Sequence, residues 1–222
     1  MIAKATIEKF GDGSTRIIEE PLPVPSEHRF ILGLDLGKSQ DYTALSALEM
    51  IDNHEEAKDA TYHCWYLERF KLGTSYPDQV ARVRELCKRE PLLTNKPWLA
   101  VDQTGVGAVV VDLFRRAHLN AIMRPILIHG GAATTDEGGV YHVPKRELVG
   151  VVQVALQTGR LKIAADLPET AILTQELQNF QVEISDSGRD TYEARVGAHD
   201  DLVLSVAMAL WLAQKRSYWR ML

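Results

Sequence analysis

The sequence predicts an α/β domain in which an antiparallel meander is followed by parallel strands, with helices on the faces of the mixed sheet. Three short β-prone segments with turn-rich connections come first, at residues 30–35, 43–50 and 61–70. Strands and helices then alternate, which is typical of parallel strands joined by helical crossovers. The chain of 222 residues is 45% apolar and 25% charged, the balance of an ordinary globular protein.

The first 28 residues are predicted to form an arm and a linker. A Gly-Asp-Gly-Ser turn signal at 11–14 separates two short β-prone pieces. Pro21, Pro23 and Pro25 then stiffen an extended connection. The regular domain is therefore expected to cover residues 29–222.

The second half of the chain is predicted to alternate helices and strands. Residues 77–90 place Val80, Val83 and Leu86 at helical spacing. The helix at 105–118 is expected to turn Val109, Val110, Leu113 and Phe114 toward the core. The other expected segments are strands at 97–102, 122–128 and 161–163, a mobile Gly- and Thr-rich loop at 129–141, helices at 144–158, 168–180 and 198–215, and a hairpin at 181–184 and 191–196.

Four carboxylates stand where a strand ends or a helix begins. Asp35 ends the first core strand, Asp102 ends the fourth, and Asp200 and Asp201 open the last helix. Sites on open sheets gather at the carboxyl ends of strands. Adjacent strands lie about 4.8 Å apart, so the two strand-end aspartates come within reach of one metal ion if their strands are neighbours.

Carboxylates this close together are stabilised by a bound cation. Like charges raise one another's pKa, and a bound divalent ion reverses that penalty. Oxygen ligands without Cys or clustered His favour Mg²⁺ or Mn²⁺, and two such ions about 4 Å apart can assist phosphodiester cleavage. Each Asp taken alone also has a structural explanation as a turn or helix cap. The joint order of the acids along the chain resembles the arrangement in ribonuclease H-like proteins.

Three segments resemble the nuclease motifs of phage large terminase subunits, over roughly residues 29–215. They are Gly33-Leu34-Asp35-Leu36-Gly37 with Asp41-Tyr42-Thr43-Ala44, then Val101-Asp102-Gln103-Thr104-Gly105-Val106-Gly107, and His199-Asp200-Asp201-Leu202-Val203-Leu204-Ser205-Val206-Ala207. The resemblance implies a ribonuclease H-like endonuclease that cuts double-stranded viral DNA concatemers during genome packaging. It further implies Mg²⁺ or Mn²⁺ as cofactor, with two ions bound.

On this resemblance Asp35 and Asp102 are metal ligands, and a further ligand comes from Asp200 or Asp201, a choice that the sequence leaves open. The implied partners are double-stranded DNA and a packaging ATPase, small terminase or portal protein, in the cytoplasm of the host. The chain contains no GxxxxGK[ST] phosphate loop, so ATP-driven translocation is not expected of it. The sequence fits both an excised domain and a separate gene product.

Four further side chains are candidates for contacts around the acids. Lys38 lies beside the first motif, and Lys145 and Arg146 open a helix, so all three are candidates to bind DNA phosphates. His199 precedes the Asp pair and is a candidate to position a water or a phosphate. Scattered basic residues are usually only solvated surface, and His199 is also explained as part of a helix entry or as a solvent-facing side chain.

The net charge and the hydropathy of the chain limit the classes of function that it can have. A net charge of −5 argues against a protein that coats nucleic acid, although it is compatible with a carboxylate metal site. The longest apolar stretch, at 202–213, is shorter than the ~20 residues that a membrane span needs. It is expected to be a buried helix, and no membrane association is expected.

Other functions share parts of this pattern. A Holliday-junction resolvase or a transposase-type enzyme would use the same acids, but the Asp pair at the start of a helix favours the terminase type. Asp35-Leu36-Gly37 followed by Thr43 also resembles the first phosphate motif of sugar kinases and actin-like ATPases, although no second phosphate loop follows. An inactive ribonuclease H-like docking scaffold is the remaining alternative, and it would have no electrostatic reason to keep the acids together.

Overall fold

The computed structural model describes most of the chain. The predictions for Lys38, the turn at 11–14 and the three linker prolines fall outside the described residues. The described residues are 5–9, 15–19, 27–37, 41–52, 60–105, 107–184, 190–194 and 199–218.

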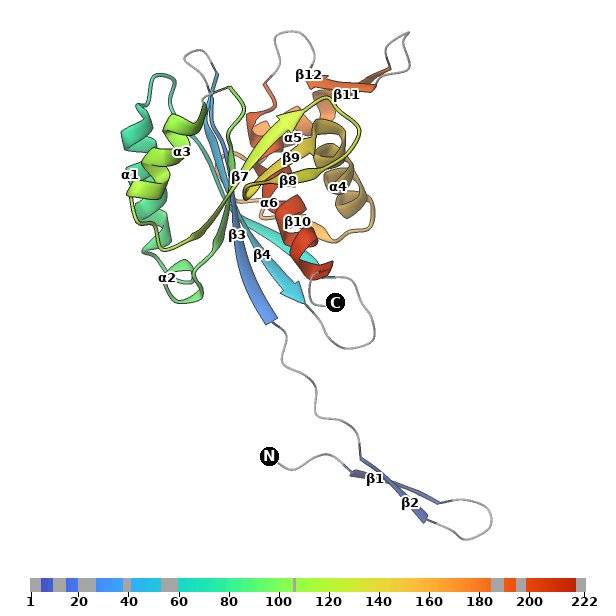
Figure 1. Cartoon of the computed structure of the whole chain (residues 1–222). Coiled ribbons are helices and arrows are strands. Elements are labelled where there is room, and N and C mark those ends of the chain that lie inside the picture. Colours follow the sequence, from blue (N-terminus) through green and yellow to red (C-terminus); the bar gives the residue numbers. More distant parts are fainter. Residues whose placement is uncertain are drawn as a thin grey trace.

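An eight-stranded mixed sheet forms the centre of the structure, in the order β10-β5-β4-β3-β6-β7-β9-β8 (Figure 1). Strands β3, β4 and β5 form an antiparallel meander, and β6, β7 and β9 continue the sheet parallel to β3. The predicted fold class is thereby confirmed. The strands are β3 Glu27–Asp35, β4 Ala44–Asp52, β5 Thr61–Arg69, β6 Trp98–Asp102, β7 Ile122–His129, β8 Thr135–Glu137, β9 Val140–Pro144 and β10 Leu161–Ile163.

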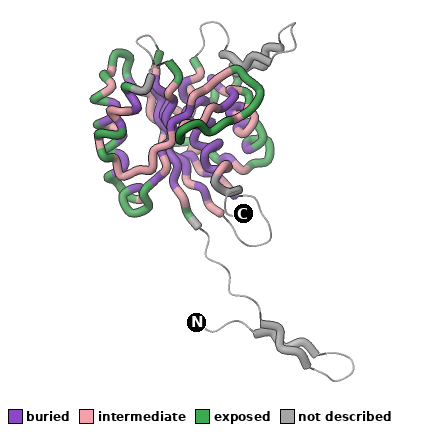
Figure 2. Tube along the Cα trace, in the orientation of Figure 1, coloured by how far each residue is buried: buried purple, intermediate pink, exposed green. Residues whose placement is uncertain are grey.

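Helices cover both faces of this sheet (Figure 1). Separate hydrophobic cores lie between the sheet and each helix layer, and the buried positions in Figure 2 follow the strands and the inner sides of the helices. Helices α1 Tyr76–Cys87, α2 Leu92–Asn95 and α3 Gly107–Arg116 cover one face, and α4 Lys145–Gln157, α5 Thr170–Asn179 and α6 Asp201–Tyr218 cover the other.

Two separate hairpins complete the described structure. Strands β1 Ala5–Lys9 and β2 Thr15–Glu19 pair antiparallel near the start of the chain. Strands β11 Phe180–Ile184 and β12 Asp190–Ala194 pair antiparallel before the last helix. Both pairs of strands had been expected from the sequence. Among the described residues, no helix combines the length and the apolar character needed to cross a bilayer.

The ends of the helices follow local capping chemistry. Ser75 caps α1, its hydroxyl accepting the backbone N–H of Asp78, and a proline occupies the first turn. Helix α4 is followed by Gly159 with a φ of +67°, the left-handed conformation that glycine adopts at low cost. These signals explain why the boundaries expected from the sequence lie within a few residues of the observed ones.

The segment at 129–141 differs from the expected mobile loop. It contains β8 and the start of β9, and both are paired in the sheet. The Thr134 hydroxyl donates to Glu147 of α4 at 2.6 Å, and the Arg146 guanidinium donates to the Ala132 carbonyl oxygen at 2.7 Å. These bonds tie the segment to α4. Short polar stretches rich in Gly and Thr look like loops in a sequence, although cross-strand pairing orders them here.

The inward side of α3 is also rotated from the expected one. Val109 is 75% exposed, whereas Val110, Val111 and Phe114 are buried. Successive residues of a helix are about 100° apart, so the stripe of Val110, Val111 and Phe114 turns Val109 toward solvent. The run of three valines allowed either side to be chosen from the sequence.

Candidate metal centre

Asp35 and Asp102 end two neighbouring strands. Strands β3 and β6 are parallel and pair with Leu34 opposite Val101, so the next residues, Asp35 and Asp102, come side by side at the carboxyl edge. The neighbour relation that the sequence argument required is thus present.

The alternation of side chains explains which face these acids occupy. Side chains on a strand point to opposite faces in turn, so residues two apart share a face. Ala100 belongs to the core under α4, α5 and α6, and Gly33 faces α6 directly. Asp102 and Asp35, two residues further along, therefore point to the face that carries α6.

Helix α6 lies unusually close to β3, and this contact brings the second pair of acids to the first. A Cβ atom on Gly33 would lie 1.8 Å from the carbonyl oxygen of Ser205, so only glycine fits at this crossing. Asp201 is the first residue of α6. The carbonyl oxygen of Asp200 accepts the Leu204 N–H at 2.9 Å, which makes Asp200 the cap of the first turn.

The four predicted carboxylates line one cleft of about 400 Å³, together with Lys145 and His199. The structure therefore brings together six of the eight residues selected from the sequence. Arg146 is not among the residues that line the cleft, and Lys38 lies outside the described residues. The cleft also takes in Asp41 from the first motif, which the sequence argument had not selected.

The carboxylates of the cleft affect one another's pKa values. The Asp35 side chain is buried, and this burial raises its pKa well above the ordinary value, with the charges of Asp102, Asp201 and Asp200 adding to the rise. Burial also raises the pKa of Asp201, against the opposing effect of a hydrogen bond from Arg69. A cluster of this kind is stabilised by any additional cation that enters it.

Asp102 also takes part in the turn that follows it. Its Oδ1 accepts the Thr104 N–H at 2.7 Å, and the Thr104 hydroxyl in turn accepts the Ile128 N–H at 2.7 Å. The turn-capping explanation for a strand-end Asp therefore holds for one oxygen of Asp102. These bonds fix the end of β6 against β7 and hold the carboxylate at the cleft.

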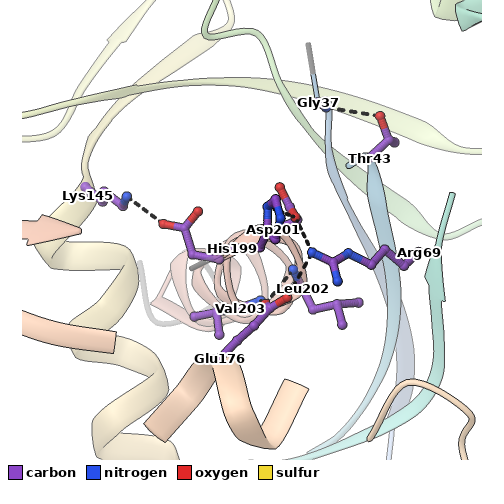
Figure 3. A network of polar contacts seen from close by, with 10 residues as sticks. Gly37, Thr43, Arg69, Lys145, Glu176, His199, Asp201, Leu202 and Val203 are labelled. Carbon is purple, nitrogen blue, oxygen red and sulfur yellow. Dashed lines mark hydrogen bonds and ion pairs between the residues drawn. The ribbon is translucent and has the colours of Figure 1, made fainter. Parts of the chain in front are cut away.

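Asp201 and the residue before it, Asp200, have different partners, and Figure 3 shows the contact of Asp201 with Arg69. Asp201 is 6% exposed, and its Oδ2 accepts a hydrogen bond of 2.9 Å from Nη2 of Arg69. Asp200 is more exposed, and its Oδ2 lies 2.7 Å from Nζ of Lys145. Nδ1 of His199 lies 3.7 Å from Oδ2 of Asp201, so His199 also faces the acids.

Sequence reasoning missed three side chains beside the cleft, namely Arg69, Tyr42 and Glu176. Arg69 ends β5, which runs parallel to β3 because two antiparallel steps separate them, so its position at the carboxyl edge was a usable signal. Tyr42 stacks on Arg69 and meets the ring of His199 edge to face. Glu176 lies within α5, and no feature of the local sequence marks it.

The donor atoms suit a hard divalent cation. The candidate ligands offer carboxylate oxygens, the preferred partners of Mg²⁺ and Mn²⁺. In the described part of the chain, no three acidic, His or Cys side chains are already closed around one point at metal-ligand spacing. Binding therefore requires side-chain adjustment of acids that already share a cleft, which is a smaller change than assembling them from separate parts of the molecule.

The order and directions of the strands, with helices on both faces of the sheet, are those of the ribonuclease H-like fold. No family model matches the chain. The chain is 25% identical over 197 residues to the large terminase subunits of Thermus phage G20c and Thermus virus P23-45, in alignments that cover 89% of this chain and 34% of each relative. It thus spans about a third of the length of these curated relatives.

Among solved structures, the chain is similar to the nuclease domains of large terminases. The magnesium-bound nuclease of phage G20c has a TM-score of 0.57 at 24% identity, covering 92% of this chain and 89% of that one. The human cytomegalovirus terminase nuclease domain has a TM-score of 0.56 at 15% identity, covering 86% of each chain. The manganese-bound nuclease domain of bacteriophage SPP1 has a TM-score of 0.52 at 11% identity, covering 83% and 86%. The resemblance seen in the three sequence motifs is thereby confirmed at the level of the fold.

Proposed function

We propose that this chain is a divalent-metal-dependent endonuclease that hydrolyses double-stranded viral DNA during genome packaging. The observation that carries the proposal is the convergence of four carboxylates, from two strand ends and one helix start, on a single cleft. Such a set of oxygen ligands is suited to phosphodiester hydrolysis with bound metal ions. The likeness to large terminase subunits supports the choice of substrate.

Asp35, Asp102 and Asp201 are the proposed metal ligands. Asp201 is preferred over Asp200 because it is the more deeply buried of the two. Each has a cationic partner, Arg69 for Asp201 and Lys145 for Asp200. Asp200 would then stand beside the site or serve a second ion. When bound, two ions of Mg²⁺ or Mn²⁺ would supply an activated water and stabilise the leaving oxygen.

The basic and neutral side chains of the cleft would act on the DNA backbone. Lys145 is the best placed of the predicted phosphate contacts, because its ammonium group lies at the rim of the acid cleft. His199 is proposed to orient a water or a phosphate oxygen from the opposite side of the acid pair. Arg146 and Lys38 stay predictions as more distant phosphate contacts.

The proposed setting is the cytoplasm of an infected host. Residues 29–222 would form the nuclease domain, and residues 1–28 an arm. A net charge of −5 gives little long-range attraction to DNA. We therefore propose that a packaging ATPase, small terminase or portal protein holds the duplex while this chain cuts it.

A plasmid-cutting assay tests the proposal. Purified protein is expected to nick or linearise plasmid with Mn²⁺ or Mg²⁺ and to stop when a chelator is added. Asp35→Asn and Asp102→Asn should each lower the rate by about a hundredfold or more, as is typical for the loss of a group that supports the transition state. Asp112→Asn, an exposed acid on α3, is the matched control and should cut normally.

Three results would redirect the assignment. Cutting that survives in both strand-end variants would remove the proposed metal site. Strong preference for a four-way junction over plain duplex, measured in the same assay, would favour the resolvase alternative. Nucleotide binding in a calorimeter would favour the kinase-like alternative.

A further inference from the structure

Arg69 reaches from the end of β5 to the first turn of α6. Its side chain is 13% exposed, and its Nη2 donates to Oδ2 of Asp201 at 2.9 Å. The same nitrogen lies 3.7 Å from Oε1 of Glu176. The guanidinium thus stands between two buried carboxylates that come from different helices (Figure 3).

Glu176 links the Arg69 guanidinium to α6, the helix that begins with Asp201. Its Oε2 accepts the backbone N–H groups of Leu202 and Val203, at 3.0 and 3.1 Å. These are donors of the first turn of α6, which have no partner within the helix. One oxygen of Glu176 therefore holds the start of α6, while the other oxygen faces Arg69.

The Tyr42 ring covers the face of the Arg69 guanidinium. The guanidinium carbon of Arg69 lies 3.8 Å from the centre of the Tyr42 ring, a cation–π contact. Tyr42 belongs to the segment that follows Gly37 and also contacts the ring of His199. The planar guanidinium is thus held by a ring on its face and by two carboxylates at its edge.

We propose that Arg69 is a positioning residue that fixes the Asp201 carboxylate in the orientation needed to bind a metal ion. The inference rests on the proposed function. The terminal torsion of an Asp side chain is broad and roughly two-fold, so an unrestrained carboxylate samples many orientations. The guanidinium binds Oδ2 and leaves Oδ1 as the oxygen for the ion. Lys would keep the charge but lose the planar geometry that restricts the carboxylate.

A simple charge-balancing role makes the opposite prediction. If Arg69 only offset the negative charge of the acids, it would compete with the ion, and removing it would tighten metal binding. A positioning role predicts weaker binding, because Asp201 would then have to be ordered when the ion arrives. Arg69→Lys keeps the charge, so charge balancing alone predicts unchanged Mn²⁺ affinity in that variant, whereas a positioning role predicts a loss of affinity.

Calorimetric titration with Mn²⁺ alone, without DNA, tests the inference in the full chain. Arg69→Lys should weaken Mn²⁺ binding by about tenfold, the lower end of the effect of residues that orient metal ligands. Tyr42→Leu leaves both ion-pair partners in place but removes the ring from the guanidinium, and should weaken binding by a smaller factor. Arg82→Lys is the matched control, because Arg82 makes a similar pair with Glu68 on the far side of β5 and should leave Mn²⁺ affinity unchanged.

The outcomes are separable. Unchanged or tighter Mn²⁺ binding by a folded Arg69→Lys protein overturns the positioning role while leaving the proposed function intact. If Arg69→Lys fails to fold, Tyr42→Leu carries the test, and unchanged Mn²⁺ affinity in that variant overturns the inference. A wild-type protein that neither binds Mn²⁺ nor cuts DNA refutes the proposed function itself.

Discussion

Replacing Asp35 by Asn is expected to stabilise the protein when a chelator is present, although it should abolish metal binding. Asp35 is 7% exposed, and its pKa is raised first by burial and then by three neighbouring carboxylates. Asn keeps the shape of the side chain and removes its charge. The substitution therefore relieves both the desolvation of the carboxylate and its repulsion by Asp102, Asp200 and Asp201.

The size of the effect follows from the strand register. Adjacent strands lie about 4.8 Å apart. If the two carboxylates keep that spacing, two full charges repel by about 3 kcal/mol at an effective dielectric constant of about 20. Proton uptake by the cluster removes part of this energy, so we expect a gain of about 1–2 kcal/mol near neutral pH. For a chain of this length that gain corresponds to a rise in melting temperature of about 3–6 °C.

The pH dependence of the stability gives a second test of whether the Asp35 charge destabilises the folded protein. Because the pKa of Asp35 is higher in the folded state than the value of about 3.9 in an unfolded chain, the folded state binds the proton more tightly. The stability that Asp35 contributes to the wild-type protein in chelator is therefore fully present at low pH and is lost as the pH rises through the interval between these two values. The advantage of Asp35→Asn should grow over the same interval.

Thermal unfolding with and without metal is the measurement. An ion at a hundred times its dissociation constant should stabilise the wild-type protein by about 2.7 kcal/mol, and Asp35→Asn should lose most of that gain. Asp112→Asn, at an exposed site, should change the stability by less than about 0.5 kcal/mol and should keep the response to metal. If Asp35→Asn instead destabilises the protein in chelator, the carboxylates do not repel one another as argued.

Three further substitutions test the scaffold of the site by chemical denaturation. Gly33→Ala places a Cβ 1.8 Å from the Ser205 carbonyl oxygen and should cost about 3 kcal/mol or more, above the usual range for overpacking because a backbone must move. Unchanged stability would refute the close contact of α6 with β3. Trp211→Phe removes the 2.7 Å bond from the indole N–H to Glu147 and should cost about 1–2 kcal/mol, and a neutral result would mean that water replaces it. Ser75→Ala should cost about 1 kcal/mol through loss of the α1 cap, and a change below about 0.3 kcal/mol would contradict the capping role.

Much of the fold could be predicted because each element carries its own local signal. Strands β3 and β6 are short apolar runs that end on Asp, and the turn-rich connections of the meander allow only antiparallel neighbours. The metal-site argument required the ends of β3 and β6 to meet, a condition that the sequence left open. The register confirms that meeting, since Leu34 pairs with Val101 directly before the two aspartates.

The features of the site that could not be predicted from the sequence depend on contacts between distant segments. Glu176 has no local mark, because its partners are backbone groups of Leu202 and Val203 on another helix. The choice between Asp200 and Asp201 could not be made from two adjacent identical residues, since only their tertiary partners, Lys145 and Arg69, make them different. Periodicity reports which residues share a face, but it carries no information on which cation a carboxylate will meet.

The candidate site is placed by rigid elements rather than by loops, and this has a consequence for its metal chemistry. Asp35 and Asp102 are fixed by strand register, and the first turn of α6 is fixed by the Gly33 crossing and by Glu176. Each of these restraints acts on the backbone, which leaves side-chain torsions as the main freedom available when an ion binds. A carboxylate torsion is inexpensive to adjust, whereas moving a strand past its neighbour would break several ladder hydrogen bonds. The scaffold therefore holds repelling charges close together, and the binding energy of a metal ion at the proposed site would go into relieving that repulsion rather than into folding the site.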